Sequence, residues 1–389
     1  METTPITGLD ELDKHLDDLI QDTSLTLNPK LFDDIELQLT ESNILPLIPR
    51  FLPRLTTILK QYTEDPTAIV DLTIKLLRPV PFEDVFSLAQ SEELITALES
   101  PAPAANLLGI AILRKAAAAP RHISFLCTHP DLVAAFIRCW LVSPQVEVGH
   151  RGSRVLGDLL DIDSAQPPPP PPTRPVDPTT VLSIRREPGH GALWDLLFRN
   201  RPMYTLLLDL ISGHHPDMLA NPPQVSLAQH RLLRLLPRLA SIDFPTVSRS
   251  DFLPPAPAYP VNGHANGGPE GQGEAVENGQ TPPPLRAPQP GEGLLQYAAL
   301  RLVSRGDFLM HMVLVDFFVT LVALMRVTAP SDLKLATLRA VVGEAVAEDE
   351  DLRKALLDLP DRTAEEEAED LRRWVGEVMP GEEVRVVVR

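Results

Sequence analysis

Apolar residues recur at three- and four-residue spacing over the first 155 residues, which is the period of an amphipathic helix. The series opens at Leu9, Leu12, Leu16, Leu19, Ile20, Leu31, Ile35 and Leu39. Acidic residues fall mostly between these positions, so each predicted helix has one apolar face that needs a neighbour. The pattern therefore predicts helices packed on one another.

Four apolar segments resemble each other, and each carries a basic residue beside a pair of aliphatic residues. They are TIKLLRPV (73–80), GIAILRKAAAA (109–119), SRVLGDLL (153–160) and HRLLRLLPRLA (230–240). Taking Leu77, Leu113, Leu156 and Leu236 as equivalent gives intervals of 36, 43 and 80 residues, the last being about two units. Periods of about 40 to 47 residues are typical of armadillo and HEAT arrays.

Between residues 92 and 142 short and long helices are predicted to alternate: a short helix at 92–99, a long one at 106–119, another short one at 122–128 and a long one at 130–142. Pro130 opens the last helix, where its missing N–H costs little. Three helices per unit is the armadillo arrangement. We expect an all-α fold, an armadillo/HEAT-like right-handed α-solenoid in which each unit buries its apolar face against its neighbours.

Composition divides the chain into five segments. Helical repeats are predicted for 1–164, 181–250 and 294–389, the last with an acidic tail, and two inserts separate them. Residues 165–180 contain a polyproline run, and residues 251–293 are rich in Pro and Gly with few aliphatic residues. Neither insert has enough apolar surface to offset the entropy of ordering it, so both are predicted to be disordered and dispensable.

The charge balance restricts the partners. With 53 acidic and 35 basic residues the net charge is −18, which repels nucleic acid and anionic membranes and favours basic protein surfaces. The two cysteines form no disulfide framework, and the first twenty residues are too acidic for a signal or transit peptide. We expect a cytoplasmic or nuclear protein.

The segment 308–325 (FLMHMVLVDFFVTLVALM) is long enough to approach the thickness of a membrane. Asp316 lies at its centre, and a charge there costs about 2.5–3.5 kcal/mol on insertion scales. A helix buried on all sides inside the protein, with Asp316 hydrogen-bonded or paired with an arginine, is the preferred interpretation, and a membrane span is the alternative.

Catalytic motifs are not found in the sequence. A phosphate-binding lysine loop and a Gly-x-Ser-x-Gly turn are both missing, and Ser153 stands between Arg151 and Arg154 rather than beside a base. We therefore expect no catalytic residue, no cofactor and no enzymatic activity.

Two sets of histidine and cysteine residues have the chemistry of metal ligands. His214 and His215 precede a proline, which indicates a turn with capping roles. Cys127, His129 and Cys139 could converge as a zinc or enzymatic site, but Cys139 lies in an apolar stripe, where a free cysteine packs as a small hydrophobe. We expect no metal.

Five arginines are the candidate partner-binding residues: Arg151, Arg154, Arg231, Arg234 and Arg238. The last three have the spacing i, i+3 and i+7 and share one helix face, and the first two have a similar place one or two units earlier. In a solenoid they would form a basic stripe suited to carboxylates of a partner. The alternative is a solvated face paired with Asp158, Asp161 and similar neighbours.

Four phrases together resemble the fungal branch of the proteasome base-assembly chaperones, the family of 26S proteasome non-ATPase regulatory subunit 5, which in fungi also carries a DNA mismatch repair name. The phrases are LLRPVPFEDVFSLAQSEELITALESPAPAANLLGIAILRKA (76–116), HRGSRVLGDLLDID (150–163), GALWDLLFRNRPMYTLLLDL (191–210) and LAQHRLLRLLPRLASID (227–243). The likeness covers most of residues 40–340 and is one of helix pattern and phrase.

The resemblance implies an armadillo/HEAT solenoid that binds the C-terminal domain of one AAA ATPase of the proteasome regulatory base. Such a chaperone escorts the ATPase into its ring and leaves before the core particle docks. We expect a protein that is monomeric when free and that contacts neither nucleic acid nor membrane directly. The alternative is a general armadillo scaffold for transport or signalling.

Overall fold

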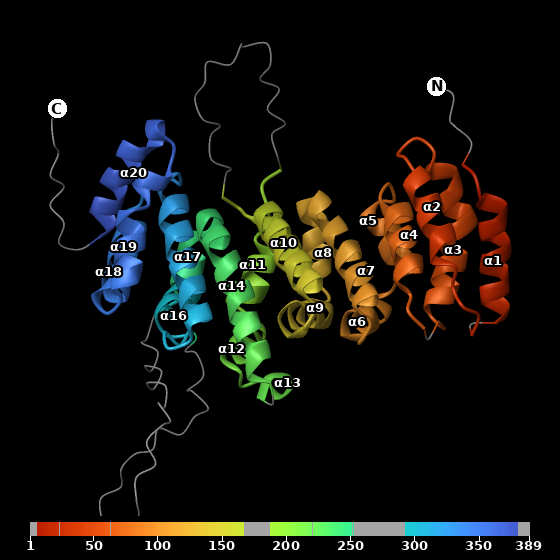
Figure 1. Ribbon diagram of the computed structural model, residues 1–389, viewed down its shortest axis with the longest axis horizontal. Coiled ribbons are helices and arrows are strands. Elements are labelled where there is room, and N and C mark those ends of the chain that lie inside the picture. The colour runs from red at the N-terminus through yellow and green to blue at the C-terminus, as the bar shows by residue number, and fades with distance from the viewer. Residues whose placement is uncertain are drawn as a thin grey trace, which may run out of the picture. The chain divides into compact units, whose positions relative to one another are not determined.

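The computed structural model describes residues 6–22, 24–62, 64–166, 187–219, 221–250, 252 and 292–379. Over these residues the fold is all-α, and the β contact found in them is a single isolated bridge between Arg249 and Glu292 (Figure 1). The chain forms two compact units, Met1–Asp163 (unit 1) and Ser164–Arg389 (unit 2). Most of the two predicted inserts, residues 167–180 and 253–291, lies outside the described residues.

Unit 1 consists of short helices joined by brief links. Their bounds are α1 Leu9–Gln21, α2 Pro29–Gln38, η1 Leu45–Leu47, α3 Ile48–Leu59, α4 Thr67–Leu77, α5 Phe82–Leu88, α6 Ser91–Glu99, α7 Pro103–Arg114, η2 Lys115–Ala118, α8 Pro120–Cys127, α9 Pro130–Val142 and α10 Val146–Asp163. The predicted succession of helices between residues 92 and 142 is confirmed, and α9 has the bounds that were predicted.

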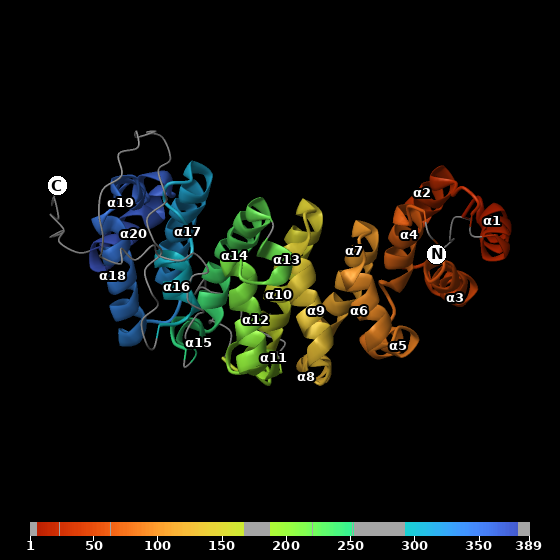
Figure 2. The same cartoon turned by 90° about the horizontal axis from the view of Figure 1, so that it is seen from below.

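The helices of unit 1 lie in two rows. In one row α4 packs on α2, α7 on α4 and α10 on α7. In the other row α1 packs on α3 and α6 on α9, and the rows are joined through the pairs α3/α4, α6/α7 and α9/α10 (Figure 2). The short helices α5 and α8 accompany the second and third pairs.

Local sequence explains where these helices begin. Proline occupies the first turn of α2, α7, α8 and α9, where its fixed φ suits the helix and its missing N–H needs no partner. Asn28 accepts a hydrogen bond from Leu31 N at the start of α2. The apolar faces of α1 to α4 are buried together in one core cluster that includes Phe32, Phe51 and Leu55.

Unit 2 has longer helices and larger interruptions. Their bounds are α11 Ala192–Phe198, α12 Arg201–Ser212, α13 Pro216–Leu219, α14 Pro222–Ile242, α15 Phe244–Ser248, α16 Leu294–Leu300, α17 Phe308–Arg326, α18 Asp332–Ala347, α19 Glu350–Leu357, η3 Pro360–Arg362 and α20 Glu365–Val378. Again two rows are present: α12, α14 and α17 pack in sequence, and α15, α16 and α18 pack in sequence beside them. The acidic C-terminal part of unit 2 forms helices with a buried face at Leu352, Leu356, Leu371 and Val375.

The prediction for α17 is right about the helix and wrong about its surroundings. One face is buried at Leu314, Phe318 and Leu321, but Asp316 is exposed, so the helix is not enclosed on all sides. Its packing partners α14, α19 and α20 cover only part of its circumference. By length and composition α17 could cross a membrane, and 39% of its most apolar window is buried within the protein.

Candidate functional site

The arginines of α10 stand on a surface of mixed charge. Arg151 and Arg154 are exposed, and Arg151 pairs with Glu147 at 3.2 Å, one turn away on the same helix. Asp71 of α4 lies near this pair: burial raises the pKa of its carboxyl, Glu36 and Glu147 raise it further, and Arg151 opposes them. Arg151 therefore neutralises nearby acids rather than projecting a positive field into solvent.

The serine among these arginines has a structural role. Ser153 Oγ accepts a hydrogen bond from Trp140 Nε1 at 2.8 Å and donates to Gly149 O at 3.0 Å. Gly152 lets α10 approach α9, because a Cβ there would lie 2.8 Å from Trp140 Cδ1. The Ser153 hydroxyl therefore ties α9 to α10.

The arginines of α14 do not share one environment. Arg231 is buried, with 4% of its surface exposed, whereas Arg234 is exposed and Arg238 is half-buried. Burial lowers the pKa of His230, and the charges of Arg234 and Arg231 lower it further, while Asp316 of α17 opposes them. The surface between α14 and α17 therefore combines a histidine, an arginine and a carboxylate.

The five predicted arginines are divided between the two units: α10 of unit 1 carries two, and α14 of unit 2 carries three. The continuous stripe stays a prediction. Within unit 2 the i, i+3, i+7 spacing marks one side of α14, but burial of Arg231 leaves Arg234 as the most exposed of the three.

The cysteine and histidine candidates have structural surroundings. Burial, with a contribution from Asp163, raises the pKa of the Cys127 thiol to about 12, so it is protonated at neutral pH and a poor ligand or nucleophile. His129 contacts the rings of Phe86 and Phe125. Within the described part of the chain, three or more metal-ligating side chains do not gather anywhere. That the protein is no enzyme stays a prediction.

The two adjacent histidines cap a turn between α12 and α13, as predicted. His214 Nδ1 lies 2.5 Å from Ser212 Oγ, and His215 Nδ1 accepts from Asp217 N at 3.3 Å.

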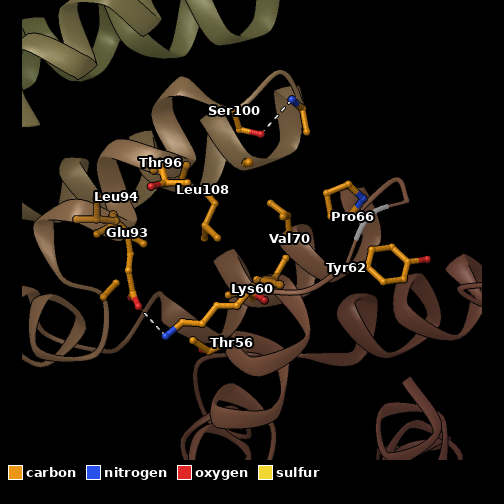
Figure 3. A pocket seen from close by; sticks show the side chains of 18 of the residues that line it. Thr56, Lys60, Tyr62, Pro66, Val70, Glu93, Leu94, Thr96, Ser100 and Leu108 are labelled. Atoms are coloured by element: carbon orange, nitrogen blue, oxygen red, sulfur yellow. Dashed lines mark hydrogen bonds and ion pairs between the residues drawn. The ribbon is translucent and has the colours of Figure 1, made fainter. Parts of the chain in front are cut away.

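A pocket in unit 1 is the main feature that the sequence did not reveal. It has a volume of about 490 Å³ and lies between α3 and α6, with α4, α5 and α7 completing its walls (Figure 3). Here the second row is interrupted, because α1 packs on α3 and α6 packs on α9, but α3 and α6 have at most marginal contact. We call this opening the α3/α6 slot.

The walls of the slot are apolar, with Leu52, Leu59, Val70, Leu94 and Leu108 among the lining residues. Small side chains line the facing side of the slot: Ala97 on α6, Ala102 before α7 and Ala105 on α7. Gly109 lets α6 approach α7, because a Cβ there would lie 3.0 Å from Leu98 Cδ2. Such a cluster of alanines, in and between the predicted helices 92–99 and 106–119, is the sequence signal that could have indicated the slot.

Three threonines line the slot, but their hydroxyl protons are used within their own helices. Thr56 donates to Leu52 O, Thr73 to Ile69 O and Thr96 to Glu92 O, at 2.7–2.8 Å. The walls therefore offer few free donors.

A side-chain amide holds the α6/α7 wall in place. Asn106 Nδ2 lies 3.0 Å from the carbonyl oxygens of Ala97, Leu98 and Ser100, at the end of α6. Because Asn106 is buried, these contacts fix the two helices relative to each other.

Charged residues stand at the rim of the slot. Lys60 Nζ, at the end of α3, pairs with Glu93 Oε1 of α6 at 2.7 Å, and the pair bridges the opening (Figure 3). At another part of the rim, burial raises the pKa of the Tyr62 phenol, and the carboxylates of Glu64 and Asp65 raise it further. The rim is therefore more acidic than basic.

Comparison with known proteins does not identify the chain: no family model, no curated protein and no solved structure matches it. The likeness to the base-assembly chaperones consequently stays a prediction.

Proposed function

We propose that this chain is a helical-repeat assembly chaperone that binds the C-terminal domain of a AAA ATPase of the proteasome regulatory base. Two lines support the proposal. The first is the resemblance of residues 76–116, 150–163, 191–210 and 227–243 to that chaperone family. The second is the packing of unit 1, in which helix pairs repeat along two rows as they do in armadillo and HEAT solenoids.

The observation that carries the proposal is the repetition of the pairs α3/α4, α6/α7 and α9/α10, with α5 and α8 as the short third helix of the last two pairs. A repeat of this kind buries each pair only against its neighbours and leaves long faces open to a partner. We propose a right-handed α-solenoid on this basis.

Charge supports a protein partner with basic surfaces. The net charge is −18, and near α4 the carboxylates of Glu36, Asp71 and Glu147 act on one another.

Affinity purification of the tagged full chain from its source cells, followed by mass spectrometry, tests the proposal. We expect base ATPases without the proteolytic core. Capture of mature proteasomes, or of no ATPase, would contradict it; transport or signalling proteins in their place would identify a general scaffold.

The binding mode is tested by co-expressing the full chain with single ATPase C-terminal domains. One domain should co-purify at a stoichiometry of one to one, and equal binding of all domains would argue against a dedicated chaperone. Replacing Arg234 by Glu is the sharpest single test of the arginine hypothesis, since Arg234 is exposed and its substitution leaves the core intact. The matched control is Arg199→Glu, an exposed arginine directly after α11 and outside the predicted stripe.

A further inference from the structure

The α3/α6 slot is the place in unit 1 where the row of helices has an unfilled position. We infer that it is a docking site for an apolar segment of a partner protein that also carries an arginine or lysine. The inference rests on the proposed function only in taking the bound molecule to be a protein segment.

The walls select an apolar occupant. Leucine, valine and alanine side chains of five helices line the slot, and the three threonine hydroxyls among them donate within their own helices. A donor or acceptor pushed into this space would lose its hydration without gaining a partner. Burying aliphatic side chains there removes apolar surface on both molecules from water.

The shape favours a segment of protein over a compact ligand. The slot occupies the interval between α3 and α6 that direct helix contact fills elsewhere in the row, and it is open to solvent beside the Lys60–Glu93 pair (Figure 3). Leu88, which lines the rim, keeps 55% of its surface exposed. Apolar contact surface therefore continues from the slot onto the outside of unit 1, as in grooves that take amphipathic helices.

The rim specifies the charge of the occupant. Of the described residues that line the slot, Lys60 is the one cation, and Glu93 already pairs with it. Glu64 is exposed on the rim beside Tyr62, with Asp65 next to it. An arginine or lysine placed here gains the carboxylate of Glu64 as a partner, whereas an acidic residue is repelled.

The test uses the full chain and fluorescein-labelled helical peptides, with binding followed by fluorescence anisotropy. The first peptide has leucine at every third or fourth position and arginines beside that apolar face. In the second peptide glutamate replaces arginine, and in the third serine replaces leucine. We expect the first to bind at least tenfold more tightly than either of the others.

A matched pair of variants locates the binding site. Thr96→Trp places an indole at the mouth of the slot from an exposed position, and should weaken the arginine peptide at least tenfold. Thr57→Trp is the control, because Thr57 is an exposed threonine of α3 that bonds its own helix and does not line the slot. Equal binding by both variants would overturn the inference. Circular dichroism checks that both variants are folded. If Thr96→Trp does not fold, Ala105→Phe, which fills the slot from α7, takes its place in the test.

A second pair of variants tests the charge. Glu64→Lys should abolish the preference for arginine over glutamate peptide, whereas Glu41→Lys, an exposed acid outside the slot, should retain it. If Glu64→Lys still prefers the arginine peptide to the glutamate peptide, Glu64 is not the residue at the rim that selects a cation. The wild-type chain could instead bind an apolar dye, in a way that Thr96→Trp blocks, and bind none of the peptides. That result would indicate a small-molecule site and would also overturn the inference.

The same variants separate this inference from the proposed function. If wild type and Thr96→Trp capture base ATPases equally, the slot is not the docking site although the proposed function holds. If the arginine peptide binds in the slot but purification yields no ATPase, the proposed function fails and the slot remains assigned.

Discussion

The two units are built from similar rows of helices, but they bury different chemistry. Unit 1 turns from helix to helix through short links, and its buried polar residues are Thr73, Asn106, His122 and Asp163. Unit 2 buries three long cationic side chains, Arg231, Arg301 and Lys334, each with 3–4% of its surface exposed. Arg301 lies at the end of α16 and Lys334 in the first turn of α18. Buried polar contacts therefore stabilise these two helix ends.

The first of these junctions lies between Arg249 and α16. Arg301 holds Glu292 through two hydrogen bonds of 2.8 and 3.0 Å, and Glu292 forms a β-bridge with Arg249. Gly293 passes so close to the chain before the insert that a Cβ would lie 2.4 Å from Arg249 N. Glu292 and Gly293 were assigned to the predicted insert, but both pack against described residues of unit 2.

The second junction is the end of α17. Lys334 Nζ lies within 3.1 Å of the carbonyl oxygens of Met325, Thr328 and Ala329 and 2.8 Å from Thr328 Oγ1. The last carbonyls of a helix have no partner within it, so this ammonium supplies the missing donors.

The largest effect is expected from Arg301→Met. Breaking the pair leaves the largely buried Glu292 carboxylate without its cation, which should cost about 3–5 kcal/mol of unfolding free energy. Denaturant unfolding of the full chain measures it. In unit 1 the matched change is Arg138→Met, which breaks a more exposed pair with Glu99 and should cost about 1 kcal/mol or less. Equal costs would remove the difference between the units.

Lys334→Met should destabilise unit 2 by about 2–3 kcal/mol, because several carbonyl acceptors lose their donor. Thermal or denaturant unfolding checks this. The unit 1 control is Lys75→Met, since Lys75 pairs loosely with Glu36 at 3.8 Å and should cost under about 1 kcal/mol. A neutral Lys334→Met would show that water replaces the ammonium.

Unit 1 should respond instead to changes in packing. Gly152→Ala places a methyl group 2.8 Å from the Trp140 ring, and separating α9 from α10 should cost about 1–2 kcal/mol. Gly306→Ala in unit 2, whose Cβ would meet nothing closer than 3.6 Å, is the control and should be tolerated. Equal melting temperatures of the two variants would contradict the expectation.

The smallest effect concerns pH. Because burial and then Arg234 and Arg231 hold the pKa of His230 below 6.5, the unfolded chain binds more protons than the folded one between the lowered pKa and 6.5. Stability should therefore decrease as pH falls through that window, and His230→Gln should flatten this part of the profile. Unfolding free energies measured across the window, with His15→Gln as the control in unit 1, test the expectation; identical profiles for wild type and His230→Gln would refute it.

The helices and turns that local patterns mark could be predicted from the sequence. Apolar spacing and initial prolines define α9, and Pro216 marks the turn that His214 and His215 cap. These features depend on neighbours within a few residues, where backbone sterics and local hydrogen bonds dominate, so they can be read from the chain directly.

The degree to which neighbours cover the polar side of a helix, and the places where the rows leave space, follow from the tertiary packing. The spacing of Arg231 and Arg234 marks a shared side of α14, but the rotation of α14 against its neighbours buries one and exposes the other. Asp316 is exposed because its neighbours cover only part of α17, and the α3/α6 slot exists because α3 and α6 do not close on each other. Periodicity within one helix marks its apolar side, but the cover that neighbouring helices provide depends on volumes contributed by residues far apart in the chain.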